Sequence, residues 1–141
     1  MTDQEKADKI VYKLMYPLDA FSQWMQIDII KVSPGACEIK AEIRSDMLNG
    51  FNVCHGGVTF SLADSAFAFA SNSRGVQALS IETSISHSRP VLSGDIITAS
   101  ARELNLSSRL AIYDVVLTNQ NNESVAFFKG TVFRTGKQWE V

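Results

Sequence analysis

The segment from residue 56 to residue 73 constrains the fold of this chain more than any other. Its apolar side chains cover nearly every side of a helix, and Arg74-Gly75 supply a basic last turn and a glycine that ends it. A helix with so little polar surface must be buried on most of its sides. The rest of the chain therefore has to pack around this helix and bury its apolar side chains.

The segments around this helix are mostly predicted to be strands. Apolar and charged residues alternate through residues 36–43, which is typical of a half-buried antiparallel strand. The alternation in a later strand places Ile81, Ile85 and His87 on one face. The expected elements are a helix over residues 2–19 and strands over residues 25–32, 36–43, 79–87, 96–104, 110–118 and 124–134. This order predicts an α+β fold, with an antiparallel sheet wrapped around one long central helix and an N-terminal helix beside it.

Length and composition narrow the class of protein. The 141 residues contain no repeat, linker or low-complexity stretch, so residues 1–141 are predicted to form a single domain. A formal charge of −2 argues against nucleic acid or an anionic membrane as the main partner. The two cysteines are too few for a disulfide framework or a metal site. No signal-peptide pattern and no bilayer-length apolar run is present, which predicts a cytoplasmic protein.

One acid, Asp64, interrupts the apolar central helix. An ionised carboxylate is costly in such surroundings unless it is hydrogen-bonded or used in chemistry. Burial should raise its pKa, which is the usual way in which a carboxyl group is tuned for acid–base work. Two interpretations stay open for this residue alone: a catalytic carboxylate, or an acid that is exposed or bonded to a neighbouring loop.

The triplet His55-Gly56-Gly57 begins the same helix. Glycines allow another group to approach the backbone closely, and the first N–H groups of a helix have no intrahelical partner. Together with the helix dipole, these groups can hold an oxyanion. The alternative is that the glycines only make a sharp turn and that His55 packs beside it.

The spacing of Gly56 and Asp64 restricts how they can cooperate. Eight residues along one helix separate them by roughly 12 Å. A reacting carbonyl must lie about 3 Å from both the donor and the attacking group. If the two residues share a reaction, they must come from different subunits, which predicts a homodimer with two shared active sites. The open edges of the expected sheet also favour dimerisation.

Three short motifs follow one another at a specific spacing: MLNG at residues 47–50, CHGG at residues 54–57 and FSLADSAFA at residues 60–68. Together they resemble the hotdog-fold acyl-CoA thioesterases of the PaaI, or phenylacetic acid degradation, family. The Arg89-Pro90 and Gly94-Asp95 pairs extend the resemblance, which covers most of the chain after about Gln26. It implies the hotdog fold and hydrolysis of an acyl-CoA thioester, with phenylacetyl- or hydroxyphenylacetyl-like groups as the nearest class. Members are commonly homotetramers, and the reaction needs no metal or other cofactor.

The resemblance also implies catalytic roles. The position matching Asp64 activates water or attacks the thioester directly, and both mechanisms remain open. The Gly56 N–H would polarise the thioester carbonyl. The positions matching Asn49 and His55 would shape the loop and hold the carbonyl or the leaving group.

Four further residues are candidates for contact with the acyl-CoA substrate. Gly57 and Phe60 belong to the matching motifs, and Arg89 is the leading candidate for a phosphate of CoA. His87 and Ser88 stand where the family often has an aromatic and a large aliphatic residue. His87 either approaches the acyl pocket or is a structural histidine. This departure bears on the acyl specificity and not on the reaction.

Two other functions remain open on the same fold. A hydratase or dehydratase acting on acyl thioesters needs a histidine and an acid that converge on one substrate, and only His55 and His87 are available. A non-catalytic acyl-CoA-binding protein would need no ionisable group at Asp64. Release of free CoA from acyl-CoA substrates distinguishes the thioesterase from the binding protein.

Overall fold

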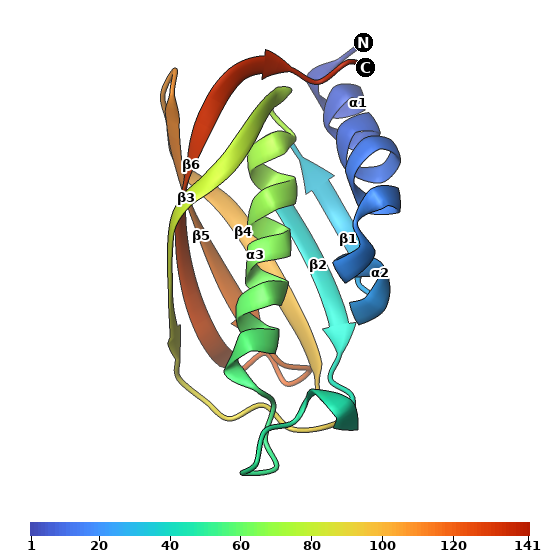
Figure 1. Ribbon diagram of the computed structural model, residues 1–141, viewed down its shortest axis with the longest axis vertical. Coiled ribbons are helices and arrows are strands. Elements are labelled where there is room, and N and C mark those ends of the chain that lie inside the picture. The colour runs from blue at the N-terminus through green and yellow to red at the C-terminus, as the bar shows by residue number, and fades with distance from the viewer.

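A computed structural model describes residues 1–141, and its main feature is one antiparallel sheet curved around the helix α3 (Gly56–Asn72) (Figure 1). The six strands run in the order β1-β2-β4-β5-β6-β3, so β1 and β3 form the two edges. Their bounds are β1 (Asp28–Ser33), β2 (Ala36–Glu42), β3 (Val76–His87), β4 (Ile96–Leu106), β5 (Leu110–Thr118) and β6 (Ser124–Gln138). The predicted sheet around one central helix is confirmed.

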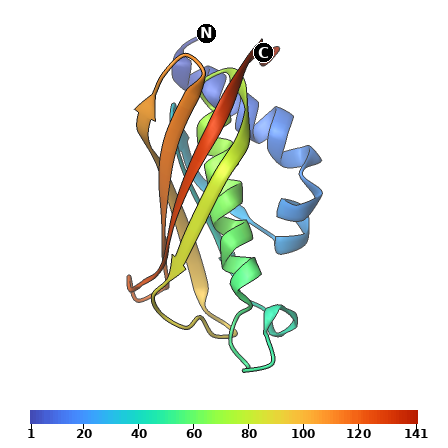
Figure 2. The ribbon, with the colours of Figure 1, turned by 60° about the vertical axis from the view of Figure 1, so that its left-hand side comes forward.

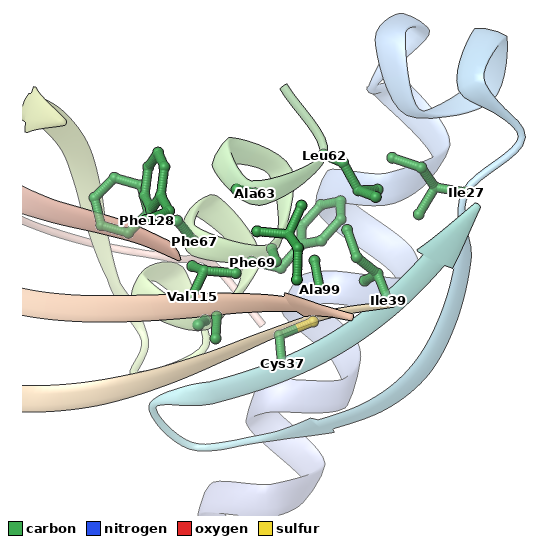
Figure 3. Close-up of a cluster of buried hydrophobic side chains, with 14 of the residues drawn as sticks. Ile27, Cys37, Ile39, Leu62, Ala63, Phe67, Phe69, Ala99, Val115 and Phe128 are labelled. Atoms are coloured by element: carbon green, nitrogen blue, oxygen red, sulfur yellow. The ribbon is translucent and has the colours of Figure 1, made fainter. Parts of the chain in front are cut away.

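The concave face of the sheet buries α3, as the apolar sequence of this helix predicts. One continuous cluster of buried side chains includes residues from α3 and from all six strands. Leu62 and Phe69 of α3 belong to this cluster, together with Ile39 and Ala99 of the sheet (Figure 3). Each large aliphatic or aromatic side chain buried in this way contributes about 1.5–3 kcal/mol of transfer free energy.

Phe67 of α3 approaches the sheet at its centre. Its ring contacts Tyr113 and Phe128, with centroids 5.8 and 5.5 Å apart. Gly130 of β6 lies beneath this ring, and a Cβ added there would stand 2.6 Å from the nearest ring carbon. The absence of a side chain at Gly130 therefore sets how closely α3 can lie on the sheet.

The N-terminal segment is helical, as predicted, but it is not one uniform α-helix. It begins as α1 (Asp3–Asp8), continues as π-helical turns over Lys9–Met15 and ends as a 3₁₀ turn over Tyr16–Leu18. It lies on the β1 side of α3 (Figures 1 and 2). The Tyr16 hydroxyl donates a 2.6 Å hydrogen bond to the carbonyl of Ile27 and ties the segment to the start of β1.

A short helix, α2 (Ala20–Met25), precedes β1 and was not predicted. The side chain of Asp19 caps it by accepting from the Ser22 N–H at 3.0 Å. Gln26 ends it in the left-handed conformation, with φ of 55°. The strand therefore begins at Asp28 rather than at residue 25. The sequence did not indicate α2, because six residues are too few to show a helical period.

A β-bulge changes the prediction for β3. Ser80 pairs with Val132 and Glu82 with the adjacent Thr131, so Ile81 is an extra residue without a partner on β6. The bulge shifts the alternation by one residue, because side chains alternate with a period of two. Ile81 is consequently 59% exposed, and the prediction that it shares a face with Ile85 and His87 is wrong.

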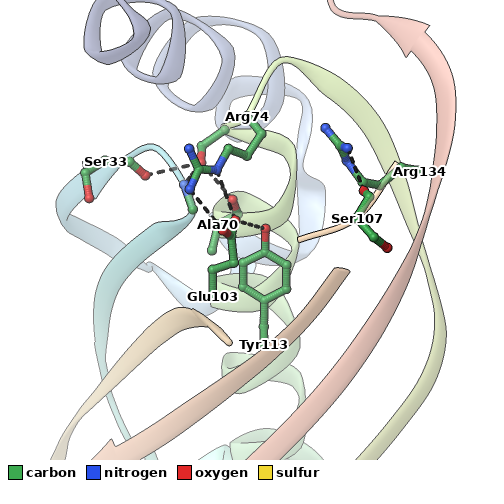
Figure 4. A network of polar contacts seen from close by, with 9 residues as sticks. Ser33, Ala70, Arg74, Glu103, Ser107, Tyr113 and Arg134 are labelled. Atoms are coloured by element: carbon green, nitrogen blue, oxygen red, sulfur yellow. Dashed lines mark hydrogen bonds and ion pairs between the residues drawn. The ribbon is translucent and has the colours of Figure 1, made fainter. Parts of the chain in front are cut away.

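The C-terminal end of α3 is held by a polar network (Figure 4). Arg74 donates two 3.0 Å hydrogen bonds to the carboxylate of Glu103, which also accepts from the Tyr113 hydroxyl at 3.0 Å. The Ser73 hydroxyl donates to the carbonyl of Ala70 at 2.7 Å. Two-point contacts of this kind fix geometry as well as charge, so the far end of α3 is anchored to the sheet.

None of the helices combines the length and the apolar composition that a membrane span requires.

Candidate active site

The loop before α3 is ordered by Asn49. Its side-chain oxygen accepts hydrogen bonds from the N–H groups of Phe51 at 2.9 Å and Val53 at 3.4 Å. The backbone N–H of Asn49 donates to the carbonyl of Val53 at 2.8 Å. Leu48 and Cys54 form an isolated antiparallel bridge across the same loop. Asn49 thus has the geometry of a residue that shapes the loop.

His55 is the N-cap of α3. Its Nδ1 accepts from the Gly57 N–H at 2.9 Å, and its carbonyl accepts from the Val58 N–H at 2.9 Å. A Cβ on Gly57 would lie only 3.0 Å from His55 Nδ1, so glycine permits this cap. The imidazole satisfies one of the free donors at the helix start.

The N–H of Gly56 is left without an acceptor in the chain. It lies at the positive end of the α3 dipole. The loop before α3 and the segment after β3 meet here, at the lower end of Figure 1, where the Cys54 N–H donates to the carbonyl of Val91 at 2.7 Å. Between them lies an open cavity of about 360 Å³, lined by Val53, Cys54, Gly56, Thr59, His87, Ser88, Arg89, Pro90 and Val91. Gly56, whose N–H has no acceptor in the chain, thus lines a space large enough for part of a ligand.

Asp64 lies two turns further along α3 and is partly buried. Its carboxylate forms no hydrogen bond and no ion pair within the chain, so the interpretation that it is bonded to a neighbouring loop is not supported. Burial raises the pKa of Asp64 above its ordinary value, and the nearby carboxylate of Asp19 raises it further. An acid that is neither satisfied nor fully solvated is a candidate for chemistry.

Gly56 and Asp64 do not form one site within this chain. Both belong to the same uninterrupted helix, so eight residues at 1.5 Å each separate them by about 12 Å. Asp64 is also absent from the lining of the cavity at Gly56. Within one chain, Gly56 and Asp64 are therefore too far apart to act on the same carbonyl group.

His87 is the last residue of β3 and packs against the first turn of α3. Its Nε2 lies 2.8 Å from the hydroxyl of Thr59. A Cβ on Gly56 would lie 3.3 Å from His87 Cε1, so the imidazole lies against Gly56. The sequence indicated that His87 faces inward but gave no sign of its partner Thr59, which lies one turn after Gly56 and is only 2% exposed.

Phe60 and Arg89 are placed differently. Phe60 packs edge-on against Phe128, with ring centroids 5.6 Å apart, and stays partly exposed. Arg89 lines the cavity, but its guanidinium is paired with Glu123 at 3.1 Å. Because both partners are substantially exposed, this pair contributes little stability and can open toward an anionic ligand. No group of three or more His, Cys, Asp or Glu side chains is placed to hold a metal ion.

Comparison with known proteins decides the family. The sequence profile described as thioesterase superfamily matches residues 51–126, which include the cavity lining and Asp64. The chain belongs to the thioesterase superfamily. The predictions of this family, of the hotdog fold and of a thioester hydrolase are thereby confirmed.

Three comparisons with two relatives place this thioesterase more closely. It is 39% identical to the acyl-coenzyme A thioesterase PaaI of Escherichia coli over 86% of this chain and 87% of that one. The structure of the E. coli PaaI protein, from the phenylacetic acid degradation operon, matches with a TM-score of 0.94 and 36% identity over 97% of this chain and 99% of that one. A Streptococcus mutans protein bound to acetyl CoA matches with a TM-score of 0.78 and 28% identity over 80% and 91% of the two chains.

Proposed function

We propose that this thioesterase hydrolyses acyl-CoA thioesters to the free acid and CoA. The observation that carries the proposal is the unpaired N–H of Gly56, a residue that lines a cavity at the positive end of α3. A donor held in this way is suited to the negative charge that develops on the thioester carbonyl oxygen. The E. coli relative is named an acyl-coenzyme A thioesterase, and the S. mutans relative is bound to acetyl CoA.

For the acyl group, we propose an aryl-acetyl unit such as phenylacetyl or hydroxyphenylacetyl. The support is the high similarity to the E. coli protein from the phenylacetic acid degradation operon. Both cysteines are free and buried, which suits the reducing cytoplasm where we place the reaction.

We assign the chemistry to Asp64 and Gly56. In one mechanism, the Asp64 carboxylate takes a proton from a water molecule that attacks the thioester carbon. In the other, the carboxylate itself attacks that carbon and forms an anhydride, which water then hydrolyses. Gly56 N–H stabilises the oxyanion in either case. The carbon–sulfur bond breaks, the carboxylic acid forms, and the proton removed from water ends on the CoA thiol. His55 and Asn49 keep Gly56 in position, because one caps α3 and the other orders the loop before it.

We place each active site between two subunits of a homodimer. Asp64 of one chain would face Gly56 of the other, since the separation of about 12 Å along one helix prevents them from sharing a carbonyl. The edge strand β3 has one unpaired side and exposes Leu79 and Ile81, at 64% and 59%. An edge of this kind favours pairing with a second copy, and we propose that two such dimers form a tetramer.

Measurement of CoA release from aryl-acetyl, short-chain and long-chain acyl-CoA substrates tests the activity. We expect the highest kcat/KM with phenylacetyl- or hydroxyphenylacetyl-CoA. Binding of these ligands without CoA release would instead support the non-catalytic binding protein. Hydration of an enoyl-CoA without CoA release would support the hydratase.

A heterodimer tests the shared site. Chains carrying Asp64→Asn and chains carrying Gly56→Pro are each expected to be inactive, because each removes one half of both sites. Mixed dimers keep one intact Asp64 and one intact Gly56 facing each other at one of the two sites. We expect each mixed dimer to recover up to half of the activity of a wild-type dimer, and a verified heterodimer that stays inactive would contradict the shared arrangement.

A further inference from the structure

His87 contacts two residues in the first turn of α3. It ends β3, where its register partner on β6 is Ala126. Its ring lies against Gly56, and its Nε2 lies 2.8 Å from Thr59 Oγ1. These contacts place the exposed imidazole against the first turn of α3, next to Gly56.

The contacts of Thr59 determine which ring nitrogen carries the proton. The Thr59 hydroxyl lies 3.1 Å from the carbonyl oxygen of Gly56, and it is placed to donate to that oxygen. A hydroxyl has one proton to donate, and a carbonyl oxygen can only accept. Both short contacts are hydrogen bonds only when His87 Nε2–H donates to Thr59 and Thr59 donates to Gly56. In the neutral ring, Nδ1 is then an acceptor.

The cavity consequently offers a matched pair of polar groups. The Gly56 N–H is a donor, His87 Nδ1 is an acceptor, and neither has a partner within the chain. Both residues line the cavity, whose apolar wall includes Val53 and Val91. Polar groups in such a place favour a ligand that satisfies them. The ligand that fits has an acceptor and a donor close together.

On the basis of the proposed acyl-CoA substrate, we propose that His87 is a specificity-determining residue whose Nδ1 accepts a hydrogen bond from an N–H or O–H group near the thioester carbonyl. Acyl-CoA has two sources of such a donor. One is the amide N–H of the pantetheine arm, which one ethylene unit separates from the sulfur. The other is a hydroxyl group on the acyl carbon next to the carbonyl. Either donor would approach His87 while the carbonyl oxygen accepts from Gly56.

Two variants of His87 and two pairs of substrates test this inference. His87→Phe keeps an aromatic ring and removes both nitrogens, whereas His87→Asn keeps an acceptor atom near the position of Nδ1. Thioesters of phenylacetic acid with N-acetylcysteamine and with O-acetyl-2-mercaptoethanol differ only in the amide N–H, which the ester lacks. Mandelyl-CoA and phenylacetyl-CoA differ only in the hydroxyl group next to the carbonyl.

The readout is the ratio of kcat/KM within each pair, because a merely structural role of His87 would lower both members equally. We expect one ratio to favour the donor-bearing member in the wild type, to fall about fivefold in His87→Phe and to be largely restored in His87→Asn. The pair that responds identifies the source of the donor. Equal ratios in wild type and His87→Phe for both pairs would overturn the inference. A wild-type protein that hydrolyses none of these thioesters would instead refute the proposed function.

Discussion

Replacement of Asp64 by Asn should affect catalysis and stability in opposite directions. Asn has nearly the same shape but cannot accept a proton from water or attack a thioester. Loss of a general base typically lowers turnover about 10²–10⁴-fold, so we expect kcat to fall at least about a hundredfold. The same change removes a partly buried negative charge that has no hydrogen bond and that repels Asp19.

The stability effect depends on pH in a direction that follows from the raised pKa of Asp64. A carboxyl group whose pKa is higher in the folded protein favours folding when protonated, and this contribution is lost as the pH rises through the raised pKa. The penalty for the charged form is therefore complete once the pH lies above the raised pKa, and it vanishes below the unfolded value of about 4. We expect Asp64→Asn to be more stable by about 1 kcal/mol at pH 7, a modest value because solvent still screens the side chain. The melting temperature should rise by about 3 °C.

The assay combines kinetics and thermal unfolding at one fixed protein concentration, since dissociation of an oligomer makes the melting temperature depend on concentration. Wild type and Asp64→Asn are compared between pH 4 and pH 8. The wild-type kcat/KM should fall toward acid pH with a midpoint above the ordinary aspartate value, because the active form is the carboxylate. Near-normal turnover of the variant would remove Asp64 from the mechanism. A variant less stable than wild type at pH 7 would show that the charge of Asp64 is favourable in the folded protein and would refute the desolvation argument.

Two further predictions concern packing and thiol reactivity. Gly130→Ala should lower stability by about 3 kcal/mol, the upper end for overpacking, because its Cβ would meet the 1%-exposed ring of Phe67 at 2.6 Å. The control is Gly50→Ala, whose Cβ meets nothing within 4 Å. Equal melting temperatures for the two variants would refute this prediction. Burial raises the pKa of the Cys37 thiol to about 12 and that of Cys54 to about 11, so both stay protonated at pH 8 and should react far more slowly with a thiol reagent in the native than in the denatured protein. Rapid reaction of the native protein at pH 8 would contradict this.

The fold follows from the sequence wherever one element carries its own signal over many residues. The central helix shows a long apolar run and the strand β2 an alternating pattern, and their predicted limits differ from the observed ones by a residue. The helix α2 shows no such pattern, because it depends on the side-chain cap of Asp19 and on the left-handed residue Gln26. The bulge at Ile81 is equally invisible, since it is a property of the pairing between β3 and β6.

The features of the candidate site also fall into those that the local sequence determines and those that depend on tertiary contacts. By itself the sequence determined the buried helix, the single acid Asp64 within it and the glycines at its start, because these are consecutive residues governed by local helix geometry. The tertiary structure decided that Asp64 has no partner, that Gly56 lines a cavity, and that His87 contacts Thr59. These facts depend on contacts between segments far apart in the chain, and no spacing within one segment can specify them.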